Sequence, residues 1–125
     1  MALPWNWGSQ ATKDWSAQVI ASSASATGTS NSNDNKIGTE HTFKITYGSG
    51  ASQGVTIYVL PTYDGTTYQT TSDNNYRFEA PYVDNGTAYT QVFVPPTYPD
   101  YKIAIDNASG ASATIWHKAR TATTS

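Results

Sequence analysis

The sequence predicts an all-β protein: an antiparallel β-sandwich, jelly-roll-like, with about seven or eight strands. Thr, Ser, Gly, Asn and Ala dominate the 125 residues, which balances strand formers against turn formers. Apolar and polar residues alternate in short runs, and turn sequences separate these runs at intervals of about 8 to 15 residues. A closed barrel is the second architecture that fits this spacing. The length indicates one domain with one modest core.

The first 14 residues are predicted to form a flexible N-terminal arm, because Pro4 and Gly8 interrupt any regular element. Two interpretations of its tryptophans stay open. Trp5 and Trp7 either fold back onto their own domain or reach a neighbouring subunit or partner. On the second interpretation the partner-binding residues of the arm are Leu3, Pro4, Trp5 and Trp7.

Alternation predicts the strands that follow the arm. A first strand is expected in residues 15–26, and further strands in 40–47, 55–60, 76–80 and 88–94. Strands 40–47 and 55–60 are predicted to pair antiparallel, because only a small-residue turn joins them. Residues 28–36 are expected to be a solvated polar loop, and the Asp64-Gly65 turn marks a short hairpin or a decorated loop.

Residues 101–120 are predicted to form a β-hairpin around a turn at 106–110, since Asp, Asn and Gly suit hairpin loops. The alternation places Ile103, Ile105 and Ile115 in the core. The predicted sandwich therefore spans residues 15–120, and residues 121–125 are expected to be a flexible tail.

Charge and composition exclude several classes of function. The net charge is −2, with seven basic and nine acidic residues and no basic stripe, which argues against nucleic-acid binding. Cysteine is absent, so neither disulfides nor thiolate metal sites can form. No apolar run approaches the roughly 20 residues that cross a bilayer, and the start lacks the features of a signal peptide, so cytosolic synthesis is expected.

No catalytic motif is present, and the protein is predicted not to be an enzyme and to need no cofactor or metal. His41 and His117 are the only imidazoles, and neither has the sequence context of a nucleophile–base pair. His41 alternates in step with Phe43 and Ile45, while His117 does so with Ile115. Both histidines are therefore expected to be packed or surface residues of strands.

Aromatic side chains are the remaining functional signal. Four of them are candidates for a surface that stacks on sugars or meets a partner: Tyr63, Tyr68, Tyr98 and Trp116. Asp64, Asn74 or Asp100 would then donate or accept hydrogen bonds with sugar hydroxyls. The alternative is that several of these aromatics only seal the ends of a thin sandwich.

The chain resembles the small β-sandwich virion proteins of tailed bacteriophages, particularly capsid decoration (cement) proteins and tail-associated accessory proteins. The resemblance rests on the Thr-, Ser-, Ala- and Gly-rich strands of residues 15–94, the strand end at 93–96, and the turn at 102–110 followed by 114–120. It implies a non-enzymatic protein, made in the bacterial host cytoplasm and carried in the virion.

Such a protein would bind the major capsid protein or other virion proteins as a homo-oligomer, typically a trimer, through a terminal arm. Here the matching arm residues are Trp5 and Trp7. The competing hypothesis is a carbohydrate-binding or receptor-binding adhesin subunit of a phage tail or fibre, whose partner would be a surface glycan.

Overall fold

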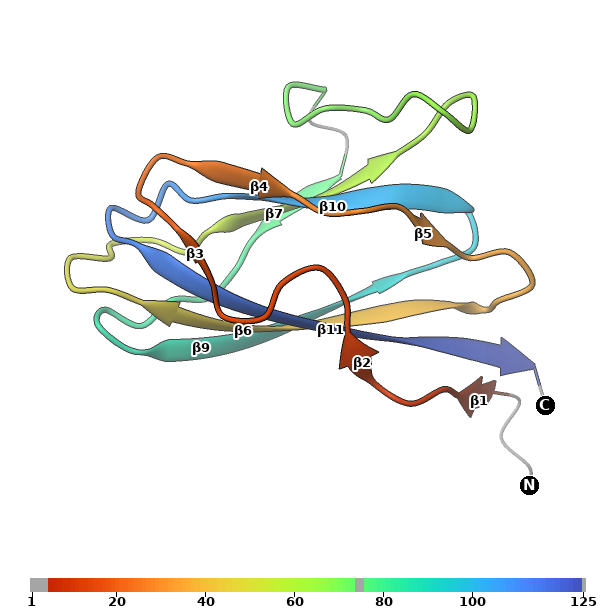
Figure 1. The fold of residues 1–125 in the computed structure, drawn as a ribbon, viewed down its shortest axis with the longest axis horizontal. Coiled ribbons are helices and arrows are strands. Elements are labelled where there is room, and N and C mark those ends of the chain that lie inside the picture. Colours follow the sequence, from red (N-terminus) through yellow and green to blue (C-terminus); the bar gives the residue numbers. More distant parts are fainter. Residues whose placement is uncertain (1–4, 74–75, 125) are drawn as a thin grey trace.

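The computed structural model describes residues 5–73 and 76–124, which form an antiparallel β-sandwich (Figure 1). Sheet A contains β1 (Trp5–Trp7), β2 (Ala11–Thr12), β3 (Gln18–Ile20), β6 (Gly38–Tyr47), β9 (Thr87–Val94) and β11 (Ala113–Thr124). Sheet B contains β4 (Ser25–Thr27), β5 (Asn31–Ser32), β7 (Thr56–Pro61), β8 (Arg77–Glu79) and β10 (Asp100–Asp106). None of the described residues belongs to a helix that could cross a membrane.

The strand order confirms the predicted jelly-roll-like sandwich. Sheet A has the order β1-β11-β6-β9, with β2 and β3 also pairing with β11, and sheet B has the order β4-β10-β7-β8, with β5 pairing with β10. The described residues form eleven strands instead of seven or eight because two edge positions are broken. If β1–β3 count as one strand and β4–β5 as another, eight positions form two four-stranded sheets, which is the jelly-roll arrangement.

The core lies between the sheets and is filled by the inward-facing residues of the long strands. Phe43 and Ile45 of β6 face Ile57 and Val59 of β7 across the sandwich, and all four are fully buried. Ile103, Ile105 and Ile115 are also fully buried, as the alternation predicted. At about 25 cal/mol per Å² of apolar surface removed from water, such side chains supply most of the stability of a domain this small.

Two predicted strand pairings are wrong. Residues 101–120 do not form a hairpin, because β10 belongs to sheet B and β11 to sheet A. The connection turns between sheets because Asn107 is buried in it, donating hydrogen bonds from Nδ2 to Ile20 O and Ala111 O, both at 2.8 Å. Likewise, 40–47 lies in β6 of sheet A and 55–60 in β7 of sheet B, so they face each other across the core instead of pairing.

The predicted ends of the domain also need correction. The single strand expected in 15–26 is divided into β3 and β4, which lie in different sheets, and Ala17 and Ser23 adopt positive φ values of 57° and 67°. The expected flexible tail is part of β11, which runs to Thr124. The expected arm is not separate, since β1 pairs with the end of β11. The described part of the arm thus follows the first interpretation, in which it folds back.

Candidate binding surfaces

One hollow in the described part of the chain is a groove on the outer face of sheet B. Residues 62–73, here called the cover loop, fold over this face, and Figure 1 shows them above β7 and β10. Because the loop covers them, Tyr58, Leu60 and Ala104 are buried although they point away from the main core. Between loop and sheet remains a groove of about 480 Å³, within the range of ligand sites.

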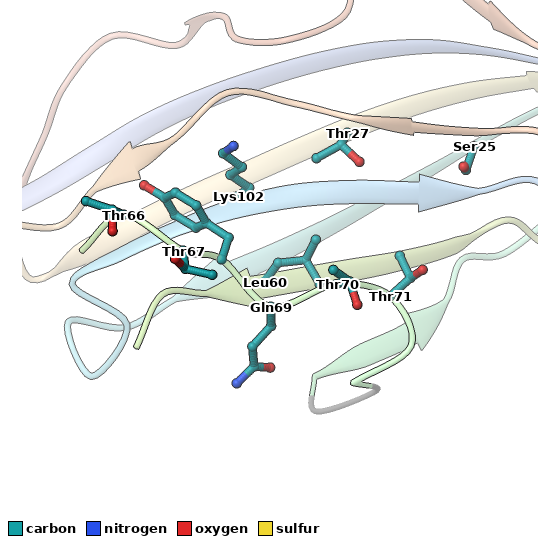
Figure 2. A pocket seen from close by; sticks show the side chains of 10 residues that line it. Ser25, Thr27, Leu60, Thr66, Thr67, Gln69, Thr70, Thr71 and Lys102 are labelled. Carbon is teal, nitrogen blue, oxygen red and sulfur yellow. The ribbon is translucent and has the colours of Figure 1, made fainter. Parts of the chain in front are cut away.

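Hydroxyl groups and one aliphatic side chain dominate the groove. Strand β4 contributes Ser25 and Thr27, β7 contributes Leu60, and β10 contributes Lys102. The cover loop supplies the remaining lining residues: Thr66, Thr67, Tyr68, Gln69, Thr70 and Thr71. In Figure 2, Ser25, Thr27, Thr70 and Thr71 lie toward one end of the groove, with Lys102 and Thr66 toward the other.

The cover loop is held by its own polar contacts. Asp64 Oδ1 accepts hydrogen bonds from the backbone N–H groups of Thr66 at 2.9 Å and Thr67 at 2.7 Å. These bonds lower the pKa of Asp64 to about 2. Thr62 Oγ1 donates to Thr67 O at 2.7 Å, and Gln69 N donates to Pro61 O at 2.9 Å. The groove is therefore formed before any ligand arrives.

Tyr68 is fixed at the groove by two contacts. Its hydroxyl donates to Asp100 Oδ1 at 2.8 Å, and the Lys102 ammonium lies 4.5 Å from the centre of its ring. The hydrogen bond to Asp100 is the main reason that the pKa of Tyr68 is raised. These contacts hold the ring and the ammonium together in the lining of the groove.

The structure brings some of the predicted site residues together and separates others. Tyr63, 99% exposed, and Tyr68 both belong to the cover loop. Tyr98 packs edge-on against Tyr76, with 5.6 Å between ring centres, as expected of an aromatic that seals the sandwich. Trp116 lies on the opposite sheet. Leu3, Pro4 and Asn74 fall outside the described residues.

A second aromatic surface lies on the outer face of sheet A. Register places Tyr89 opposite Lys44 and Lys44 opposite Trp116, so these three side chains form a row across β9, β6 and β11. The Lys44 ammonium lies 4.6 Å from the centre of the Trp116 ring, and Tyr89 is 66% exposed. Together with Thr42 and Lys118 they line a hollow of about 310 Å³.

The tryptophans of β1 form a third aromatic group at the far end of the same face. Trp5 stacks on Phe93 of β9 with 5.6 Å between ring centres, and the Phe93 ring reaches across β6 because Gly38 has no Cβ. Trp7 packs against the Arg120 guanidinium, 4.1 Å from the ring centre. Both tryptophans stay partly accessible, at 40% and 37% exposed.

Inside the sandwich, four polar side chains form a buried chain that the sequence did not reveal. Tyr101 OH lies 2.6 Å from His41 Nε2, and His41 Nδ1 lies 2.8 Å from His117 Nε2. His117 Nδ1 faces Asp14 Oδ2 at 3.7 Å. Both histidines are fully buried. One proton arrangement fits both hydrogen bonds: Tyr101 donates to His41, and His41 donates to His117. His117 Nδ1 then carries the remaining N–H, which faces the carboxylate from beyond hydrogen-bonding distance.

Burial keeps both imidazoles neutral. It lowers the pKa of His41 to about 3, with repulsion from a charged His117 as the second cause. It lowers the pKa of His117 to about 4, although the Asp14 carboxylate opposes this shift. Burial would raise the pKa of Asp14 itself, but hydrogen bonds from Thr29 and the charge of Lys13 bring it below its ordinary value.

The buried chain and the groove are separate. None of the groove residues belongs to the chain of Asp14, His117, His41 and Tyr101, so the imidazoles do not face a ligand there. Within residues 5–73 and 76–124, no group of three or more His, Cys, Asp and Glu side chains comes close enough to hold a metal ion.

Sequence reasoning missed Tyr89, Lys44 and Lys118 as surface residues of one hollow. The alternation did place Tyr89 and Lys44 on the faces opposite to the buried residues of their strands, which was the available signal. Alternation does not show which strands are neighbours or how they are aligned, and only the register of β9, β6 and β11 brings these residues together.

Comparison with known proteins gives likeness of fold. No protein-family profile matches the sequence, and no curated protein matches it. A structure of Bacillus endospore appendages, described as disulfide-linked pili, is 14% identical and covers 98% of this chain and 90% of its own, with a TM-score of 0.48. A carbohydrate-binding module of Cellvibrio mixtus lichenase 5A, in complex with cellotriose, is 9% identical, covering 91% and 88%, with a TM-score of 0.46.

A family 29 carbohydrate-binding module is similar to the same degree, at 11% identity, covering 95% of this chain and 90% of its own, with a TM-score of 0.44. At identities and TM-scores this low, the likeness is one of fold alone. It also does not extend to the covalent links of the pili, since this chain has no cysteine.

Proposed function

We propose that this chain is a non-catalytic carbohydrate-binding protein that holds a neutral sugar in the groove under the cover loop. The observation that carries the proposal is the lining of that groove: hydroxyl groups from two sides around Leu60 and Tyr68. A sugar ring presents hydroxyls at its rim and C–H groups on its faces. Such a ligand matches a site with many hydroxyl partners and a small apolar floor.

Two features favour binding over catalysis. Hydrolysis of a glycosidic bond needs a pair of carboxyl groups across the bond, and no described residue lining the groove carries a carboxylate. The nearby Asp100 is hydrogen-bonded to Tyr68, and Asp64 is engaged by its own loop. The groove thus offers hydrogen bonds and packing surface without an acid–base pair.

A glycan array followed by calorimetry with the best neutral oligosaccharide tests this function. Thr27→Val removes a hydroxyl from the strand side of the groove without changing its shape, and we expect about fivefold weaker binding. Tyr68→Ala removes the ring and should weaken binding further. Tyr82→Ala is the control, because it removes an exposed tyrosine that lies outside the groove. Absence of binding to any neutral glycan would refute the proposal.

A second candidate is the virion role, in which the protein decorates a phage capsid or tail as a homo-oligomer. The observation that favours it is the partly exposed aromatic group of Trp5, Trp7 and Phe93, because aromatic residues concentrate binding energy at interfaces. Co-sedimentation with undecorated capsids, lost in the Trp5→Ala/Trp7→Ala variant, would support this role. Failure to sediment with any capsid or tail particle would exclude it.

A further inference from the structure

We propose that the outer face of sheet A carries a second binding site, separate from the groove, for a sugar chain that bears carboxylate groups. The site is the hollow lined by Thr42, Lys44, Tyr89, Trp116 and Lys118. It lies on the sheet opposite to the groove, so neither site contributes a residue to the other. The ligand class is a polyuronate or another acidic polysaccharide.

The strand register places a lysine between two aromatic residues at this site. Tyr89, Lys44 and Trp116 lie side by side on three adjacent strands. With neighbouring strands about 4.8 Å apart, the two ring-bearing residues are separated by about 10 Å, with the ammonium between them. A sugar ring that rests on one aromatic face therefore reaches the Lys44 ammonium with a substituent on its edge.

Charge selects an acidic ligand. The described parts of β6, β9 and β11 carry four charged side chains on this face, and two of them, Glu40 and Arg120, are paired with each other at 2.9 Å. The other two are the exposed Lys44 and Lys118, and no carboxylate is among the described residues that line the hollow. The hollow thus carries two positive charges although the whole chain has a net charge of −2.

Hydroxyl groups on either side of the ring row fit a sugar chain. Thr46 and Thr87 lie two residues along the strands from Lys44 and Tyr89, with their hydroxyls 2.9 Å apart, and Thr42 lies between Gln91 and Lys118 two residues in the other direction. These groups provide hydrogen-bonding partners for the hydroxyls of neighbouring sugars. An aliphatic acid has no hydroxyl groups, so it would leave the polar side chains on both sides of the ring row without a hydrogen-bonding partner.

A single-stranded nucleic acid would also combine rings with negative charge, but it requires a groove whose cations follow the backbone. Here the next residues on this face, two positions beyond Lys118 and Thr42, are Arg120 and Glu40, whose charges neutralise each other. The unpaired positive charge on this face of the described strands is therefore limited to two lysines. The observations favour the polyuronate, and an oligonucleotide becomes one arm of the test.

The test is calorimetric titration of the full chain with oligogalacturonate, its fully methyl-esterified form, and oligothymidylate. We expect oligogalacturonate to bind, with an affinity that falls as salt rises, while the ester and the oligonucleotide bind much more weakly. Equal binding of the ester would show that the carboxylates are not recognised, and it would overturn the proposal. Tighter binding of oligothymidylate would assign the hollow to nucleic acid, and absence of binding by all three would exclude the site.

Matched variants locate the binding. Lys118→Gln and Arg77→Gln each remove one exposed positive charge, but Arg77 lies on sheet B. We expect Lys118→Gln to weaken oligogalacturonate binding about fivefold and Arg77→Gln to leave it unchanged. Equal losses in both would mean a general charge effect and would overturn the proposal. Tyr89→Ala should weaken binding, whereas Thr27→Val in the groove should not, which separates this site from the neutral-sugar site.

Discussion

Lowering the pH from about 7 to about 4.5 is expected to destabilise the sandwich through its buried histidine pair. The pKa values of about 3 for His41 and about 4 for His117 lie below the 6.5 of a free imidazole. Over this window the unfolded chain takes up two protons that the folded chain refuses, so acid favours unfolding and stability rises with pH. Asp14 does not contribute here, since its pKa is lowered from 3.8.

The size of the effect follows from the shifts. A pH of about 4.5 lies about two units below the pKa of each unfolded histidine, which costs the folded state about 2 to 3 kcal/mol per imidazole and about 5 kcal/mol for the pair. Total stabilities of single domains are about 5 to 15 kcal/mol. Acid at this level is therefore expected to remove much of the stability, or all of it.

Urea unfolding followed by tryptophan fluorescence at several pH values measures this loss, because Trp15 packs against His117 with 5.3 Å between ring centres. The free energy of unfolding should fall with a slope approaching about 3 kcal/mol per pH unit, as two protons require. His117→Gln should halve the slope while also lowering stability at neutral pH. A flat profile, or an NMR titration that places either histidine near its free pKa, would refute the reasoning.

Three further predictions concern single contacts. Asn33→Ala should lower the free energy of unfolding by about 3 kcal/mol in urea titrations, because the buried Asn33 donates hydrogen bonds from Nδ2 to the carbonyls of Val94, Pro95 and Tyr98; a loss within error would contradict this. Gly54→Ala should prevent folding, seen as loss of the β-sheet circular dichroism signal, since its Cβ would overlap the Ala80 carbonyl. Trp5→Ala should cost about 1 kcal/mol by thermal melting, through the lost stack on Phe93; an unchanged melting temperature would mean that the stack contributes nothing.

The fold class could be predicted from the sequence because alternation is a local property. In β10, Ile103 and Ile105 alternate with Lys102 and Ala104, and this alternation places both isoleucines on the face that packs into the core. Which sheet a strand joins is not local. The turn after Asp106 has the composition of a hairpin loop, yet the buried Asn107 side chain turns the chain into the other sheet.

The binding surfaces were predictable only in part. Tyr68 and Trp116 were predicted as surface aromatics, but the lysines beside their rings were not. Lys44 reaches the Trp116 ring because β6 pairs with β11, and Lys102 of β10 reaches the Tyr68 ring because the cover loop folds over sheet B. For some polar residues, the composition of their segment led to a wrong prediction of exposure. Residues 28–36 have the composition of a solvated loop, whereas Asn31 and Asn33 are buried and bind backbone carbonyls of distant strands.

The place of β11 in sheet A has a consequence for how the chain is made. β11 lies between β6 on one side and β1, β2 and β3 on the other, so residues 5–20 have no strand to pair with until the last strand has left the ribosome. Pairings this distant along the chain form slowly. A nascent chain without β11 exposes one unpaired edge of β6, which is a template for association between unfinished copies. Synthesis that stalls late should therefore yield aggregate, whereas completion of the chain allows the sheet to close.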